Sequence, residues 1–232
     1  MNAGGERDRL ALMTERERIS AKAGSFFDEL WDRGDPWELE TSVFERERYA
    51  RLIGILDRPK YARILEIGCG AGAFTRQLAP LAERLLALDV SAKAIAKAQA
   101  AGDTPKHVEF RHANIMDYDM KKEGPWDLIL ISETIYYLGW LYSFFDVTWL
   151  AAELFAATRD TGQLVMANTC GGVPDCLVRP WIIRTYHDLF LNVGYWSKSE
   201  EVFRGAKNGT DLEILISVFT RGKQDRRLAG VL

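Results

Sequence analysis

The chain has 232 residues, 47% of them hydrophobic, which is enough to bury the core of one α/β domain with an appended cap. Its 30 basic and 33 acidic side chains leave a formal net charge of −3, so it lacks the positive field that holds nucleic acid, and a small-molecule partner is expected. Three cysteines without a C-x-x-C pair argue against a disulfide framework and favour a reducing, cytoplasmic setting.

The N-terminal quarter predicts one amphipathic helix after a polar segment. Residues 1–22 mix charges with few apolar groups, which is typical of a frayed or solvated helix, so we expect a flexible segment here. Ser42-Val43-Phe44-Glu45 is a capping box, in which the hydroxyl and the carboxylate satisfy free amides at a helix start. Apolar residues then recur at helical spacing, and we expect this helix to end at Pro59 after a docking face made by Tyr49, Leu52, Ile53 and Leu56.

Strands and helices alternate in the middle of the chain. Predicted strands occupy residues 62–68, 84–90, 107–112, 126–133 and 161–169, and a helix is expected to begin at Ser91. This order implies right-handed crossovers and a parallel sheet that is covered by helices on both faces.

A helix is also predicted between the fourth and fifth strands. Its expected buried face consists of Leu141, Phe145, Trp149, Ala152 and Phe155. The surrounding stretch, residues 140–157, is the most hydrophobic in the chain, but it is short and contains two acidic residues. We therefore expect neither a membrane span here nor a signal peptide at the polar N-terminus.

The C-terminal part changes character. A helix is predicted near residues 181–190, followed by extended segments at 195–203 and 211–219. The Asn-Gly pair between these segments is typical of a hairpin turn, so the parallel sheet is expected to finish in an antiparallel hairpin. Residues 23–221 are thus predicted to form a single domain, and residues 222–232 a basic tail.

The stretch ILEIGCGAGAF, residues 64–74, predicts a ligand site. Glycines where a strand enters a helix leave backbone amides open to a ligand, and both NAD and S-adenosylmethionine are bound in this way. Glu66 would repel a pyrophosphate but attract the ammonium of an amino acid, whereas Asp89 suits the ribose of either ligand. The hairpin leaves no second mononucleotide half, so S-adenosylmethionine is favoured over NAD.

Several motifs carry a resemblance to known families. LEIGCGAG, Asp89, HANIMD and DLILISETIYYL resemble class I S-adenosylmethionine-dependent methyltransferases over residues 36–220. GDPWELETSVFERERYARL, with LEIGCGAGAFTRQLAP and SETIYYL, resembles the nodulation protein S family, N-methyltransferases that act on an amino sugar at the end of a chitooligosaccharide. The resemblance implies a Rossmann-like, doubly wound, seven-stranded sheet of order 3-2-1-4-5-7-6 with a helical N-terminal cap. The C-terminal third does not share it, which leaves the methyl acceptor open.

The resemblance also implies roles for individual residues. Glycines 68, 70 and 72 would lie against the donor, S-adenosylmethionine, and its product, S-adenosylhomocysteine, with Glu66 at the amino-acid part and Asp89 on the ribose. The adenine would meet Val90, the Asn114 side chain and the Ile115 N–H, although relatives commonly carry Asp in place of Asn114. Trp37 and Arg48 would close over the methionyl end, with Arg48 pairing its carboxylate.

Methyl transfer requires alignment, a dry site and an acceptor that has lost its proton. Glu133, just beyond the fourth strand, is the best-placed base, with Tyr136 next to it; alternatively, Glu133 holds the donor or caps the following helix. His187 is a further catalytic candidate, or a core or surface residue. Tyr136, Tyr137, Trp140 and Trp181 could line the acceptor site, under a mobile lid at residues 168–183.

Three functions fit these patterns. The first is N-methylation of an amino sugar or a similar amine, the second is O-methylation of a phenol or a hydroxylated natural product, and the third is binding of the donor without turnover. The intact donor motif disfavours the third. Cys170 and Cys176 are too widely spaced and too short of partner histidines to predict a metal site, so we expect no metal.

Overall fold

The described part of the chain forms one sheet with helices on both faces. The computed structural model describes residues 15–102 and 104–222, so residues 1–14 of the predicted flexible segment, and the predicted basic tail from residue 223 onward, lie outside it. The strands are β1 (Tyr61–Ile67), β2 (Ala82–Asp89), β3 (Val108–His112), β4 (Trp126–Ser132), β5 (Thr158–Gly171), β6 (Trp196–Lys207) and β7 (Thr210–Thr220). The helices are α2 (Glu15–Trp31), α3 (Val43–Gly54), α4 (Ala73–Leu78), η1 (Ala79–Leu81), α5 (Ala92–Ala100), η2 (Ile115–Asp117), α6 (Ile135–Leu141), α7 (Phe144–Ala157) and α8 (Pro180–Asn192).

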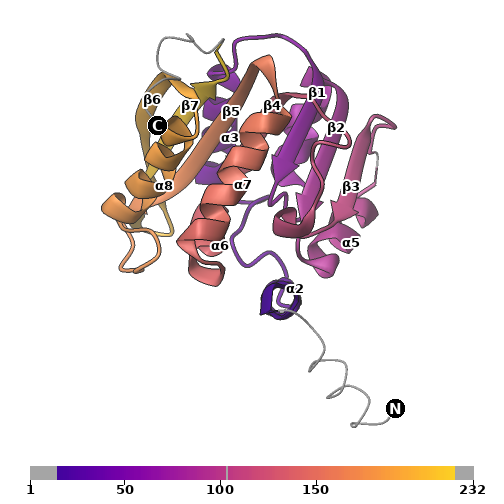
Figure 1. The fold of residues 1–232 in the computed structure, drawn as a ribbon. Helices are drawn as coiled ribbons and strands as arrows, with labels where there is room; N and C mark the ends of the chain where they lie inside the picture. The colour runs from indigo at the N-terminus through magenta and orange to yellow at the C-terminus, as the bar shows by residue number, and fades with distance from the viewer. Residues whose placement is uncertain (1–14, 103, 223–232) are drawn as a thin grey trace.

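The strand order is β3-β2-β1-β4-β5-β7-β6, which confirms the order that the resemblance implied. Strands β1 to β5 pair in parallel, whereas β7 runs antiparallel to both β5 and β6 (Figure 1). The turn between β6 and β7 is Asn208-Gly209, with φ of 51° and 75°. Two successive positive φ values are what a tight hairpin requires, so the Asn-Gly prediction is also confirmed.

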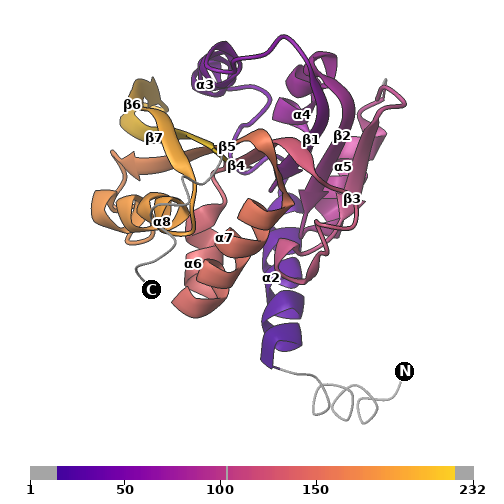
Figure 2. The same cartoon turned by 45° about the horizontal axis from the view of Figure 1, so that its top comes forward.

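Alternate strand residues pack into two separate cores. Leu65 and Ile67 belong to the core under α6, α7 and α8, while Ile64 belongs to the core under α3, α4 and α5. The helices lie on opposite faces accordingly (Figure 2). Because both faces are covered, the central strands are almost continuously buried.

Some local predictions were wrong. The exposed face of α7 carries Phe145, which is 74% exposed, and Trp149, which is 58% exposed; the predicted face also includes exposed Ala152 and half-buried Leu141 and Phe155. The helix instead buries its aliphatic residues Val147, Leu150, Ala151, Leu154 and Ala157. When apolar residues cover most of a helix, more than one of its faces shows the helical hydrophobic repeat. In α7 the aliphatic face, and not the aromatic one, packs against the protein core.

Helix α3 also departs from its prediction. It ends at Gly54, before Pro59 is reached, and Ser42 takes the N-cap position without a side-chain hydrogen bond. Glu45, the expected second half of the capping box, is 5% exposed and turns toward the protein interior. Its carboxylate is paired there with two cationic side chains, which compete successfully with the free amides at the helix start.

Candidate active site

A cavity of about 610 Å³ lies where the carboxyl ends of β1, β2 and β4 meet the N-terminal helices. This volume is within the usual range for a small-molecule site. Ala23, Phe27 and Trp31 of α2 form part of its wall, and the segment from Asp35 to Leu39 forms another. The turn between β6 and β7 contributes Lys207 and Asn208 to the wall beside this segment, so the cavity is built from both ends of the described chain.

The glycine turn after β1 packs closely against side chains of neighbouring elements. Gly68, Gly70 and Gly72 have φ of 78°, 55° and 81°, values that residues other than glycine rarely adopt. A Cβ on Gly68 would lie 2.1 Å from Thr134 Oγ1, one on Gly70 2.9 Å from the Trp31 ring, and one on Gly72 2.7 Å from the Phe110 ring. The first two glycines line the cavity, whereas Gly72 serves the packing of the turn against β3.

Asp89 lies at the end of β2 and is half-buried at the cavity. One carboxylate oxygen accepts the Gly70 N–H at 2.8 Å, and the other accepts the Ser91 N–H at 2.8 Å. Loss of solvation raises the pKa of Asp89, and these two N–H donors oppose that rise. A carboxylate has about four lone-pair positions, so the side chain is fixed in place and still able to accept from a ligand.

Glu66 is almost completely buried beside Asp89, with 3% of its surface exposed. Its Oε2 accepts a hydrogen bond from Thr75 Oγ1 at 2.6 Å. Burial raises the pKa of Glu66 to about 8, because this hydrogen bond does not offset the loss of water around the carboxylate. Glu66 is therefore a cavity-lining acid poised to ionise when a cation binds.

Trp37 and Arg48, the residues predicted to close over one end of a ligand, both line the cavity. Arg48 is 2% exposed and donates to Glu45 from Nε at 2.8 Å and from Nη2 at 2.6 Å. Its Nη1 donates to Ser132 Oγ. Two of its five N–H donors have no hydrogen-bond partner among the described residues, so Arg48 can still receive an anionic group.

Glu133 follows β4 in a left-handed conformation, with φ of 54°. Its Oε1 accepts the Thr169 N–H at 2.9 Å, and its Oε2 accepts the hydroxyls of Tyr136 at 2.8 Å and Thr169 at 2.9 Å. Burial raises the pKa of Glu133, against the effect of nearby Arg48. A strained backbone and a fully oriented carboxylate, both at a cavity wall, are typical of a functional side chain.

The predicted adenine contacts Val90, Asn114 and Ile115 also lie on the cavity wall. Asn114 Oδ1 accepts the Met116 N–H at 3.0 Å, and its amide nitrogen donates to the hydroxyls of Ser20 and Tyr142. The amide orientation is thereby fixed, with one lone pair of Oδ1 remaining. Ser20 belongs to α2, so Asn114 also ties that helix to the sheet.

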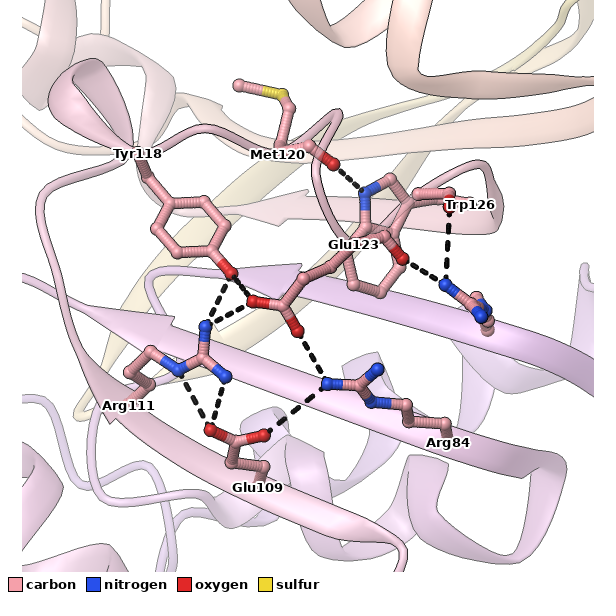
Figure 3. Close-up of polar contacts among 9 residues, drawn as sticks. Arg84, Glu109, Arg111, Tyr118, Met120, Glu123 and Trp126 are labelled. Carbon is pink, nitrogen blue, oxygen red and sulfur yellow. Dashed lines mark hydrogen bonds and ion pairs between the residues drawn. The ribbon is translucent and has the colours of Figure 1, made fainter.

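An ionic network anchors the segment that follows Asn114 and Ile115 (Figure 3). Glu123 accepts from Arg84, Arg111 and Tyr118, and Glu109 pairs with the same two arginines. The hydrogen bond from Arg111 is the main reason that the pKa of Glu123 is lowered to about 2. The network holds this segment against β2 and β3, which fixes the position of the cavity wall above it.

Other predicted site residues lie elsewhere. His187 is 1% exposed in the core, where Nδ1 lies 2.7 Å from Ser217 Oγ and Nε2 lies 3.2 Å from Asn168 Nδ2. Burial lowers its pKa to about 3, and it is not part of the cavity wall. Tyr136 and Tyr137 do line the cavity, but Trp140 and Trp181 are 49% and 70% exposed outside it.

Sequence reasoning missed several residues of the cavity wall. Phe27 and Trp31 follow the segment to which no chemistry was assigned, and their helical spacing was a signal that went unused. Asp35 stands in the quoted GDPWELE motif, and its Oδ1 is buried without a hydrogen-bond partner among the described residues. Glu45 and Lys207 were not predictable, since their partners come from distant parts of the chain.

The cavity is strongly acidic. Among the residues that the structure describes, its wall carries two cationic side chains, Arg48 and Lys207, against seven carboxyl groups: Asp35, Glu38, Glu45, Glu66, Asp89, Glu133 and Asp175. Such a wall favours ligands with positive charge or several hydrogen-bond donors. Within the described ranges, no cluster of three or more His, Cys, Asp or Glu side chains is suited to a metal ion, and no helix has the length and hydrophobicity to cross a bilayer.

A family model and several curated relatives match this chain to one family. The family model described as nodulation protein S (NodS) matches residues 23–154, more than half of the chain. Nodulation protein S of Bradyrhizobium diazoefficiens is 40% identical over 105 residues, which cover 45% of this chain and 49% of that protein. The Rhizobium tropici protein of the same name is 38% identical over 106 residues, covering 45% of this chain and 44% of the relative. The matched region thus spans about half the length of these curated relatives.

A solved structure extends the likeness beyond the matched region. The crystal structure of the N-methyltransferase NodS from Bradyrhizobium japonicum WM9, in complex with S-adenosylhomocysteine, superimposes with a TM-score of 0.71 at 25% sequence identity. The superposition covers 84% of this chain and 98% of the other. The superposition therefore extends beyond residues 23–154, the region that the family model matches.

Proposed function

The chain belongs to the nodulation protein S family, and we propose that it is an S-adenosylmethionine-dependent methyltransferase whose acceptor is an amine of a small molecule. The observation that carries this proposal is the acid-rich cavity at the carboxyl ends of β1, β2 and β4. Its wall suits a donor that carries a sulfonium and an ammonium, and an acceptor that arrives as a cation. The solved relative that binds S-adenosylhomocysteine supports the same ligand class.

The residues present fit this donor. Asp89 retains lone pairs for the two ribose hydroxyls. The buried Oδ1 of Asp35, which has no hydrogen-bond partner among the described residues, can accept a hydrogen bond from a further group of the ligand. Glu66 would hold the ammonium, and the two N–H groups of Arg48 that have no partner in the described part of the chain would hold the carboxylate. When bound, S-adenosylmethionine supplies an electrophilic methyl group on a positively charged sulfur.

Glu133 is the proposed base. Its two oxygens are oriented by Tyr136 and Thr169, and one lone pair of Oε1 is left for a proton of the acceptor. The raised pKa of its carboxyl makes it a stronger base than a solvated glutamate. Tyr136 and Tyr137 lie at the same wall and offer aromatic faces on which a sugar or another ring can stack. We therefore propose an amino sugar as the specific methyl acceptor.

A labelled-methyl assay tests the proposed function. The protein is incubated with S-adenosylmethionine that carries a labelled methyl group and with amino sugars, simple amines and phenols in parallel. Label on nitrogen of an amine is the expected result, with Asp89→Ala as a control for donor binding. Label on the phenol oxygen would replace the N-methyltransferase with an O-methyltransferase, and binding of NAD without binding of the donor would refute the proposal.

A further inference from the structure

The turn between β6 and β7 contacts the N-terminal cap at the wall of the cavity. Lys207, at the end of β6, is a cavity-lining residue whose side chain is 15% exposed. Its Nζ donates to Glu45 Oε1 at 2.6 Å and to the Trp37 backbone carbonyl. The next residue, Asn208, donates to Glu38 Oε2 at 2.8 Å. The turn therefore forms hydrogen bonds with three residues of the N-terminal cap, Trp37, Glu38 and Glu45.

Lys207 also acts on Arg48 through a shared carboxylate. The Oε1 of Glu45 binds Lys207, and its Oε2 binds Arg48 at 2.6 Å. The side chains of Glu45 and Arg48 are 7% and 2% exposed, so little water screens this row of charges. With Lys207 the row carries a net positive charge, whereas without it Glu45 would cancel the charge of Arg48.

We propose that Lys207 is a positioning residue that holds both Trp37 and Arg48 in place for the amino-acid end of the donor, an inference that rests on the proposed function. Lys207 fixes Trp37 by donating a hydrogen bond to the Trp37 backbone carbonyl. Because Lys207 balances the charge of Glu45, the positive charge of Arg48 stays available to the carboxylate of the donor. The adenosine end of the cavity, at Val90 and Ile115, has no contact with Lys207 among the described residues. Loss of Lys207 should therefore affect only ligands that carry the amino-acid part.

Two ligands and a matched pair of lysines test this inference. Calorimetry compares S-adenosylhomocysteine with 5′-methylthioadenosine, which has the same nucleoside but no amino acid. In Lys207→Met, affinity for S-adenosylhomocysteine should fall by about tenfold or more, as expected for a lost contact between buried charges, and affinity for 5′-methylthioadenosine should change less than about twofold. Lys198→Met is the control, because Lys198 lies on the same strand and pairs with Asp57 at 2.6 Å on the surface. It should change neither affinity.

Further variants of Lys207 distinguish the effect of losing its charge from the effect of a disturbed fold. Lys207→Arg should restore most of the affinity, and Lys207→Gln, which keeps an N–H donor but no charge, replaces the Met variant if that fails to fold. Hydrogen exchange of residues 35–42 should be faster in the uncharged variants than in Lys198→Met. Unchanged affinity for S-adenosylhomocysteine, or equal losses for both ligands, would overturn the inference. A wild-type protein that binds neither ligand would refute the proposed function itself.

Discussion

Binding of the donor should release a proton from Glu66. The carboxyl is 3% exposed, and burial raises its pKa from 4.5 to about 8 in the protein without ligand. At pH 7 about nine in ten molecules therefore hold this proton. An ammonium bound at Glu66 stabilises the ionised form, so that each donor or product molecule bound at pH 7 should displace nearly one proton.

The sign of the pH dependence follows from the same pKa. Only the ionised form pairs with the ammonium, so affinity for S-adenosylhomocysteine should rise by about tenfold from pH 6 to pH 7 and level off above pH 8. The stability of the ligand-free protein should change with pH in the opposite direction. Because the folded protein keeps the proton between pH 4.5 and 8 and the unfolded chain does not, the free energy of unfolding of the ligand-free protein should fall through that window.

Calorimetry in two buffers of different ionisation enthalpy measures the released proton directly. Glu66→Gln preserves the shape of the side chain and removes its titration, so proton release and the rise of affinity between pH 6 and 7 should both vanish in this variant. A wild-type binding enthalpy that is identical in the two buffers at pH 7 would refute the placement of the ammonium at Glu66.

Other predictions address the remaining groups. Asp89→Ala removes hydrogen bonds to the ribose, and the dissociation constant for S-adenosylhomocysteine should rise by about tenfold or more for each; unchanged affinity in a folded variant would exclude Asp89 as the ribose partner. Glu133→Gln should lower turnover by about 10²-fold with donor affinity nearly unchanged, and alkaline pH should restore part of the rate; weakened binding without recovery would instead make Glu133 a donor ligand. Bound product should slow hydrogen exchange in residues 20–56, and equal exchange with and without it would contradict closure of the cap. His187 has a pKa of about 3 when folded, below its ordinary 6.5, so it should make stability rise with pH between 3 and 6.5, and His187→Gln should flatten that slope in acid unfolding curves.

The sheet was predictable because each of its strands is marked by local sequence. Glycines, Ser91 and the Asn-Gly pair separate apolar runs, and a strand buried on both faces needs such a run. The glycine turn, Glu66 and Asp89 follow from this order, since parallel strands bring their carboxyl ends together. These features depend on neighbours in sequence, which is why reading along the chain recovers them.

Features that depend on distant partners were not recovered. Glu45 satisfies the capping-box pattern, yet Lys207, 162 residues away, draws its carboxylate inward. Helix α7 has apolar side chains on more than one face, and packing against the sheet selects the aliphatic one. His187 occurs in a helical stretch whose burial is decided by Asn168 and Ser217 on two strands of the sheet.

The contact between Lys207 and Trp37 joins residues 170 positions apart, which has a consequence for synthesis of the protein. A chain that has been made as far as β5 already contains the glycine turn, Asp89 and Glu133, but the wall contributed by the turn between β6 and β7 does not yet exist. Domains generally fold as units during synthesis, which proceeds at about 5–20 residues per second. The cavity therefore lacks part of its wall until residue 207 has been made, and a nascent chain that stops short of residue 207 lacks the lysine that ties its cap in place.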